Sequence, residues 1–474
     1  MNIYIRSKNN KYGVYKNNAK RASKTFTTLD EAKEYAEKLA KKENGIVIDT
    51  VTIKKITTKV KKSKVIRRTL LILFIIFLIT IIVLGYLYKD QIIAGIKPYL
   101  PSDSSSSSES STTESSSEVT VLGNSDFQIH FLELGNEYSG DCTYIKAGEV
   151  DILIDAGSKA ASATTIKKYV DQYCTDGKLE YVIATHAHED HISGFVGNTN
   201  SNSGILYQYE IGTIIEFARS NSSSKIYSNY QIARDYAVTN GAVCYTANDC
   251  FNNTNNASDT FIINNDTTLQ ILYNKYYFEK SDDENDYSVC TLFTHGNNKF
   301  LLTGDLEEKG EKALANYYKT NGGLGHVDLF KAGHHGSKTS SNDCLLDIIT
   351  PDICTICCCA GNTEYTANYN NVFPTQEFIT RIAKHTDKVY ATTVFNEKTL
   401  KFESLNGNIV ISSDKVNLEV NCTNNNTKLK DTTWFNETVY VDSSNNICSG
   451  KGKKDFFTSA TPGVKAVPRR VWPN

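Results

Sequence analysis

The sequence predicts an α/β fold in which several strands deliver polar residues to one shared site. Four short apolar segments, at residues 150–154, 181–184, 299–303 and 328–332, are each followed by polar residues at a turn. The carboxyl ends of neighbouring strands lie together in α/β sheets, so these residues are expected to meet. One strand followed by Gly-Asp is usually an ordinary turn, but four such edges in one chain indicate a site.

The densest group of potential metal ligands is the run Thr185-His186-Ala187-His188-Glu189-Asp190-His191. In an extended segment side chains alternate, so His186 and His188 point the same way from the strand end. Asp190 and His191 are expected to follow the chain into a turn. Imidazole and carboxylate groups together suit zinc, manganese or iron. The alternative, a polar loop rich in histidine, is disfavoured because the whole chain has nine histidines.

The ordered motifs of this chain resemble the metallo-β-lactamase superfamily of hydrolases. Within it, they are most similar to the extracellular domain of the ComEC competence-channel proteins and its free-standing relatives. The resemblance extends over roughly residues 126–414 and implies an αββα sandwich with metals at one edge between two sheets. The motifs that carry it are Asp155-Ala156-Gly157, His186-x-His188-x-Asp190-His191, Thr303-Gly304-Asp305, Gly333-His334-His335-Gly336-Ser337, Gly140-Asp141-Cys142, Asn285-Asp286-Tyr287-Ser288-Val289 and Ser340-Ser341.

The resemblance implies a binuclear metal site. His186 and His188 would hold the first of two divalent ions, with zinc favoured over manganese or iron. Asp190 and His191 would hold the second ion, and Asp305 would bridge both.

The same resemblance assigns roles around the ligands. His335 is favoured as the last ligand of the second ion and His334 as a catalytic group facing the substrate, although the sequence leaves the choice between them open. Asp155 would orient an imidazole through its other ring nitrogen, and Asp141 is placed in the same supporting layer.

One departure from the superfamily concerns the first ion. Many members carry another histidine before the bridging aspartate, whereas only His295 lies between His191 and Asp305 here. His295 falls in a predicted hairpin turn, where we expect it to be exposed to solvent and not bound to metal. We therefore expect two ions, the second held more tightly than the first.

The implied chemistry is hydrolysis by a hydroxide that bridges two ions ~3.5–4 Å apart. Asp190 could also steer this hydroxide or carry its proton. Ser337 and Lys338, in the hydroxyl-rich segment after the double histidine, are expected to bind substrate, and such groups suit phosphate oxygens. A helix-capping loop before Asp343 is the alternative for this segment, and both can hold together.

An apolar run predicts a membrane anchor at residues 69–88. The run has no charged residue, and twenty helical residues span about 30 Å, the thickness of a hydrocarbon core. Segment 54–68 holds eight basic residues, whereas only Lys89 and Lys97 follow the run up to position 145. The positive-inside bias predicts a single-pass cell-membrane protein with a cytoplasmic N-terminus, anionic lipid at its basic flank and an extracellular catalytic domain. A cleavable signal peptide or a buried core helix is disfavoured by the position of the run and its flanks.

Changes in amino-acid composition divide the chain into a series of predicted segments. Residues 1–53 predict a small cytoplasmic ββαβ domain, with strands at 2–5, 13–15 and 46–48 and a capping box at Thr28 and Glu31. It looks like a small bacterial family of unknown function. The predicted order is this domain, a basic segment at 54–68, the span at 69–88, a Ser-rich extracellular linker at 89–123, the catalytic domain at 124–420 and a C-terminal extension at 421–474.

The distribution of charged residues along the chain limits which substrates are expected. Residues 1–68 hold 19 Lys and Arg against 6 Asp and Glu, which leaves 32 against 47 in the remainder. A nuclease that grips long DNA needs a broad basic surface, so the acidic exterior favours small or envelope-bound targets. The tail carries basic residues, including Arg469 and Arg470, and is expected to be a solvated terminus.

All twelve cysteines follow the predicted membrane span. Outside the cell, Cys244 with Cys250 and Cys422 with Cys448 are candidate disulfide pairs, although a reducing habitat would leave them free. The cluster at 354–359 predicts a buried strand in which Cys acts as a small hydrophobic residue.

Three functions remain open from the sequence. The first is a membrane-anchored, metal-dependent phosphodiesterase or nuclease. The second is a hydrolase of another bond, such as a lactone, an amide or a phosphorylcholine ester of the cell envelope. The third is a binding module without activity. No protein partner can be inferred.

Overall fold

The computed structural model describes residues 2–8, 11–16, 22–43, 46–49, 126–135, 138–363, 365–396, 399–448 and 462–473. The chain divides into two compact units, Met1–Ser117 and Glu118–Asn474. The predicted basic segment 54–68, apolar span 69–88 and linker 89–123 lie outside the described residues. Within the described ranges, no helix combines the length and apolarity that a membrane crossing requires.

The N-terminal unit is a sheet of order β3-β2-β1-β4 packed against one helix. The backbone N–H of Glu31 donates to Thr28 Oγ1 at 3.3 Å, as the predicted capping box requires. Strand β3 is absent from the predicted ββαβ pattern because its three residues, Lys-Thr-Phe, carry no apolar alternation. The elements are β1 (Asn2–Lys8), β2 (Lys11–Lys16), β3 (Lys24–Phe26), α1 (Leu29–Glu43) and β4 (Ile46–Asp49).

The second unit contains two eight-stranded sheets. The first has the order β10-β9-β8-β7-β6-β5-β19-β20 and the second β11-β12-β13-β14-β15-β16-β17-β18. The strands of the first sheet are β5 (Phe127–Phe131), β6 (Thr143–Ala147), β7 (Val150–Ile154), β8 (Lys178–Ala184), β9 (Glu210–Glu216), β10 (Val243–Thr246), β19 (Ile409–Ser413) and β20 (Leu418–Cys422). Those of the second are β11 (Thr260–Ile262), β12 (Thr267–Ile271), β13 (Thr291–His295), β14 (Asn298–Leu302), β15 (Leu329–Lys331), β16 (Ile353–Ala360), β17 (Val389–Asn396) and β18 (Lys401–Ser404).

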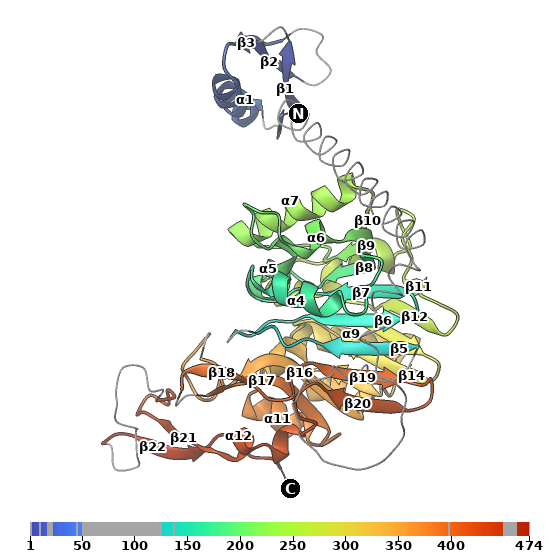
Figure 1. The fold of residues 1–474 in the computed structure, drawn as a ribbon, viewed down its shortest axis with the longest axis vertical. Coiled ribbons are helices and arrows are strands. Elements are labelled where there is room, and N and C mark those ends of the chain that lie inside the picture. The colour runs from blue at the N-terminus through green and yellow to red at the C-terminus, as the bar shows by residue number, and fades with distance from the viewer. Residues whose placement is uncertain are drawn as a thin grey trace, which may run out of the picture. The chain divides into compact units, whose positions relative to one another are not determined.

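Helices flank both sheets (Figure 1). The first group consists of α4 (Ser162–Val170), α5 (Glu189–Val196), α6 (Ile205–Gln208) and α7 (Lys225–Thr239), which contact one another beside the first sheet. In the second sheet α9 (Glu308–Asn321), α10 (Asp343–Ile349) and α11 (Gln376–Ile382) connect the successive parallel strands β14 to β17. The shorter elements are α8 (Ala247–Phe251), η2 (Lys275–Tyr277), η3 (Asn285–Tyr287), η4 (Gly333–Gly336), η5 (Leu429–Asp431), α12 (Thr433–Asn436), β21 (Thr438–Val441) and β22 (Lys465–Pro468).

The two sheets share one apolar core. The ring of Phe127 on β5 lies 4.7 Å from that of Phe300 on β14, and Tyr181 on β8 lies 5.7 Å from Phe261 on β11. Two sheets that bury their inner faces against each other, with helices outside, form a mixed α/β sandwich, the architecture that the sequence motifs imply.

Neighbouring parallel strands end at the same edge of a sheet, so the polar residues that follow them lie close together. Strand β7 runs parallel to β8, with Ile154 opposite Ile183, and β14 runs parallel to β15, with Leu302 opposite Lys331. All four predicted strands are confirmed, and the residues that follow them meet at one end of the sandwich.

His295 differs from expectation. It is buried, its Nδ1 lies 2.8 Å from Ser413 Oγ, and its ring stacks on Phe127 at 5.1 Å. The prediction of an exposed turn residue was wrong because β19 packs beside this hairpin and covers it. Its partners lie in the β5 and β19 strands and not among the ligand candidates.

The tail also differs from expectation, because Arg469 and Arg470 are buried and not solvated. Leu429, Trp434 and Phe435 of the C-terminal extension belong to the main core. A basic terminus is recognised from neighbouring residues in the sequence. These neighbours do not show that backbone carbonyls from distant segments accept hydrogen bonds from the two guanidinium groups.

The twelve cysteines are all free thiols, so neither candidate disulfide pair is bonded. Strand β16, which carries Cys354 and the run Cys357-Cys358-Cys359, is buried along its whole length. The prediction of a buried cysteine-rich strand is confirmed. Burial raises the pKa of the Cys357 thiol, which keeps it protonated and unreactive.

Candidate metal centre

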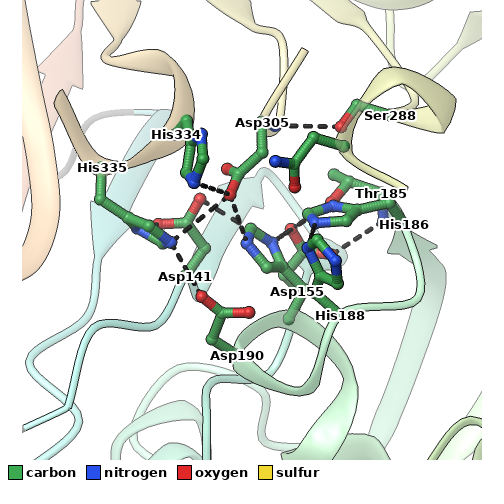
Figure 2. A network of polar contacts seen from close by, with 12 residues as sticks. Asp141, Asp155, Thr185, His186, His188, Asp190, Ser288, Asp305, His334 and His335 are labelled. Atoms are coloured by element: carbon green, nitrogen blue, oxygen red, sulfur yellow. Dashed lines mark hydrogen bonds and ion pairs between the residues drawn. The ribbon is translucent and has the colours of Figure 1, made fainter. Parts of the chain in front are cut away.

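The site lies where β7, β8, β14 and β15 end, and its side chains converge from both sheets (Figure 2). His186 and His188 leave the end of β8. Their rings lie 4.8 Å apart, and His186 Nε2 lies 3.0 Å from His188 Nδ1. His186 and His188 therefore lie next to each other, as the sequence predicts.

Asp190 and His191 stand in the first turn of α5 and not in an open turn, because the chain enters the helix directly at Glu189. Asp155 anchors this region. Its Oδ2 lies 2.7 Å from His191 Nδ1, and it accepts hydrogen bonds from the backbone N–H and Oγ1 of Thr185 at 2.8 and 2.7 Å. The other ring nitrogen of His191 therefore faces the site, as expected for an oriented ligand.

Asp305 follows β14 through Gly304 and lies at the centre of the cluster. Its Oδ2 is 3.2 Å from His191 Nε2 and 3.5 Å from His335 Nε2. Its Oδ1 is buried and, among the described residues, has no hydrogen-bond partner. A buried carboxylate oxygen without a donor is costly unless a cation occupies its free side.

The two histidines of the pair differ in burial and in contacts. His335 is fully buried, with Nδ1 2.9 Å from the carbonyl of Cys357 and Nε2 3.1 Å from Asp190 Oδ2. His334 keeps 20% of its side chain exposed and lies 3.9 Å from Asp305 Oδ2. This geometry favours His335 as a ligand and His334 as a group that faces the substrate.

Both histidines are held in a strained backbone. His334 has φ +48° and His335 φ +53°, a left-handed conformation that non-glycine residues seldom adopt. Such strain persists only where the surroundings fix it, and it is concentrated at functional sites.

Asp141 joins the site through a buried ion pair. Its carboxylate contacts Lys331 Nζ at the end of β15, and its Oδ1 lies 3.2 Å from His335 Nδ1. Lys331 is only 3% exposed. Sequence reasoning missed this lysine, although a charged residue inside a predicted apolar strand was a usable signal.

Burial and charge set the protonation of the ligands. Burial lowers the pKa of His186 well below 6.5, so its imidazole is neutral. Burial also opposes charge on His335, but Asp305 and Asp141 outweigh it and raise its pKa to about 10. Burial likewise opposes ionisation of Asp305, yet His191 and His335 hold its pKa well below 3.8.

The donor set fits a divalent cation. Ligand atoms of Asp190, His191, Asp305 and His335 all lie within 4.8 Å of one another. Two carboxylates and two imidazoles are hard and borderline donors that suit zinc, manganese or iron. Beside them, the ring of His186 lies 4.1 Å from that of His191, which places the His186 and His188 pair at the edge of the same cluster.

A cavity of about 600 Å³ opens onto this cluster. Ser337 and Lys338, the residues predicted to bind substrate, line it together with His188, Asp190, Asp305 and His334. The serine hydroxyls of the loop do not cap α10: its N-cap, Asn342, makes no side-chain cap bond, and Glu311 accepts from the backbone N–H groups of Ser341 and Asn342 at 2.6 and 2.9 Å.

Several lining residues were missed from the sequence, among them Lys159 and Tyr365. Lys159 stands two residues after the Asp155-Ala156-Gly157 motif, so its position was a usable signal. Tyr365 lies far along the chain, and its hydroxyl donates to Asp190 Oδ2 at 2.6 Å. No pattern around Tyr365 marks it.

Comparison with known families identifies two regions. Residues 135–197 match the model described as "Metallo-beta-lactamase superfamily". Residues 3–50 match "Uncharacterized protein conserved in bacteria (DUF2188)", in line with the predicted small domain of unknown function.

Curated relatives are competence and recombination proteins. "Recombination protein 2" of Haemophilus influenzae is 41% identical over 73 residues, 15% of this chain and 8% of that protein. "Competence protein ComA" of Neisseria gonorrhoeae is 31% identical over 113 residues, 24% of this chain and 15% of that protein. "ComE operon protein 3" of Bacillus subtilis is 28% identical over 111 residues, 23% of this chain and 13% of that protein. The chain therefore matches only a small part of the length of these relatives.

Solved structures with similar folds include the metallo-beta-lactamase fold protein YhfI from Bacillus subtilis, at 14% identity and TM-score 0.27, covering 44% of this chain and 70% of that one. CmlA from Streptomyces venezuelae, described as a diiron beta-hydroxylase, is 10% identical with TM-score 0.29, covering 49% of this chain and 45% of that one.

Proposed function

We propose that this chain, which carries a metallo-β-lactamase domain related to competence proteins, is a binuclear metal-dependent hydrolase of phosphodiesters. The observation that carries the proposal is the convergence of ligand atoms from Asp190, His191, Asp305 and His335 within 4.8 Å of one another beside an open cavity. Among the described residues, the buried Oδ1 of Asp305 has no hydrogen-bond partner. His186 and His188 would hold the first ion, Asp190, His191 and His335 the second, and Asp305 would bridge them.

Divalent ions in such a site supply Lewis acidity and lower the pKa of water to near 7. The protein's own groups would position the reactants. Asp155 holds Nδ1 of His191, and the carbonyl of Cys357 holds Nδ1 of His335. The Nε2 atom of each ring therefore faces the cluster. His334 lies in the cavity next to Asp305, where it can donate to a substrate oxygen or to the departing group.

Phosphodiesters are favoured over uncharged esters by the cations of the cavity. Lys159 and Lys338 both line it, and ammonium groups stabilise phosphate oxygens. The deficit of basic residues beyond position 68, 32 against 47 acidic, favours short or envelope-bound substrates over long duplex DNA. A phosphorylcholine ester of the cell envelope, itself a phosphodiester, is one such envelope-bound substrate.

The proposal is tested by hydrolysis of bis(p-nitrophenyl) phosphate, short single-stranded and double-stranded DNA, and p-nitrophenyl phosphorylcholine with zinc, manganese or iron supplied. We expect activity that EDTA abolishes. His335→Ala should lose bound metal, whereas His334→Ala should keep its metal and lose turnover. Activity that persists without metal, or equal metal loss in both variants, would contradict the assignment.

We further propose that residues 69–88 anchor the enzyme in the membrane, with the catalytic unit outside the cell. The uncharged run and its asymmetric basic flank support this placement.

A further inference from the structure

One wall of the substrate cavity is formed by residues 365–375. Tyr365, Asn371 and Phe373 of this wall segment line the cavity. On its inner side the Phe373 ring lies 5.4 Å from His334 and 5.9 Å from His335. The wall segment therefore touches the double histidine directly.

The outer side of the wall segment rests on the C-terminal residues. The guanidinium of Arg470, which is 5% exposed, donates to the carbonyls of Val372 at 2.6 Å, Pro374 at 2.7 Å and Tyr369 at 3.2 Å. It also lies over the Tyr369 ring at 4.8 Å. A planar fork of five N–H donors can serve several carbonyls that point at one place, which a compact ammonium cannot do as well.

Other contacts join the same two segments. The side-chain amide of Gln376 pairs with the backbone of Val471, donating to its carbonyl at 2.7 Å and accepting from its N–H at 2.8 Å. The Tyr369 hydroxyl donates to the carbonyl of Pro468 at 2.7 Å. The C-terminal segment therefore follows the wall segment from Tyr369 to Gln376.

We propose that the C-terminal segment 465–471 is a working part of the substrate site and that Arg470 is its positioning residue. Arg470 touches neither the cavity nor the ligands. It acts through the wall segment, fixing where Tyr365 meets Asp190 and where Asn371 accepts from Lys338 Nζ at 2.7 Å. The kinetic part of this inference rests on the proposed phosphodiesterase function.

The test compares Arg470→Met and Arg470→Lys with the intact chain. Loss of the guanidinium leaves buried carbonyls without donors, so the wall should loosen and KM for bis(p-nitrophenyl) phosphate should rise on the order of tenfold, with kcat changed far less. Arg470→Lys, which keeps one charged donor, should recover part of the loss. Bound metal should be unchanged in both.

Hydrogen–deuterium exchange supplies a readout that does not need activity. We expect faster exchange confined to residues 365–376 in Arg470→Met. Arg234→Met serves as the control, because it removes another largely covered guanidinium, 22% exposed and paired with Glu216, that lies on α7. It should change neither KM nor exchange in the wall segment.

The outcomes separate the two proposals. Faster exchange across both sheets with loss of metal would mean that Arg470 only supports the fold, and unchanged KM and exchange would also overturn the inference. If the intact chain hydrolyses no phosphodiester, the proposed function fails, and the exchange pattern alone decides the role of Arg470. If Arg470→Met does not fold, Arg470→Lys decides the same comparison.

Discussion

At the scale of single residues, the ion pair of Lys331 with Asp141 is the least expected part of the site. Both groups are nearly inaccessible, and Asp141 also faces His335. The lysine therefore offsets the charge of a carboxylate that lies behind the candidate ligands. Buried pairs add little stability by themselves, but breaking one leaves an uncompensated charge.

Substitution of Lys331 by Met should lower the free energy of unfolding by about 3–5 kcal/mol, because Asp141 then stays buried without its cation. The double variant with Asp141→Leu should recover a large part of this loss. Urea unfolding of the two single variants and the double variant measures the coupling. Additive losses would show that the pair does not interact.

The raised pKa of His335 predicts how metal binding depends on pH. With a pKa of about 10 in the metal-free protein, against an ordinary 6.5, this ring is protonated at neutral pH, whereas a ligand must be neutral. Metal uptake should therefore release protons, and affinity should rise from pH 7 towards pH 10. Calorimetric titration in buffers of different ionisation enthalpy measures the release, and a pH-independent affinity would contradict it.

The same shift affects the stability of the metal-free protein. Because the folded pKa lies above the unfolded one, the contribution of His335 is fully present below pH 6.5 and is lost as pH rises through about 10. Chelated protein should therefore unfold more easily at pH 10 than at pH 7, in contrast to protein that holds its metal.

At the scale of elements, the close packing of α5 sets the positions of Asp190 and His191, two of the candidate ligands. The helix lies directly on the strand end at Ala156, and the backbone N–H of Gly194 donates to the Ala156 carbonyl at 2.9 Å. A Cβ at position 194 would lie 2.1 Å from that carbonyl oxygen. Only glycine permits this approach.

Replacement of Gly194 by Ala should displace α5, and Asp190 and His191 with it. We expect the metal affinity to fall on the order of tenfold or more, as it does when groups that orient the ligands are lost. We also expect a lower melting temperature. Competition with a chelator measures the affinity. Gly177→Ala is the control, since no atom lies within 4 Å of the added Cβ although its φ of +74° adds some strain.

At the scale of the whole chain, charge is divided between its two parts. Residues 1–68 are strongly basic and the remainder is acidic. The basic residues beside the uncharged run favour a cytoplasmic N-terminus. The orientation remains a prediction, since the span lies outside the described residues.

Protease treatment of intact cells tests this orientation. An external protease should degrade the catalytic unit and leave a protected fragment of about the first hundred residues, the length expected for a cytoplasmic domain plus its span. A tag at the N-terminus identifies the fragment. Protection of the whole chain until the cells are lysed would reverse the predicted topology.

The sequence by itself determined the strands, the ligand candidates and their supporting aspartates. These features are local: an apolar run sets each strand, and a short motif sets the residue at its end. Asp155 meets His186 and His191 because β7 and β8 are parallel neighbours in one sheet and end together. Asp305 follows a strand of the other sheet, so its place in the cluster depends on how the two sheets pack.

Only the tertiary structure decided the remainder. It separated His334 from His335, buried His295 beneath β19, paired Lys331 with Asp141 and brought Tyr365 and Arg470 to the cavity wall. Each of these depends on contact between segments far apart in the chain, where the partner of a polar group is set by packing and not by its neighbours in sequence. From the sequence alone, Arg469, Arg470 and His295 are expected to be exposed to solvent, because the segments that cover them are distant in the chain.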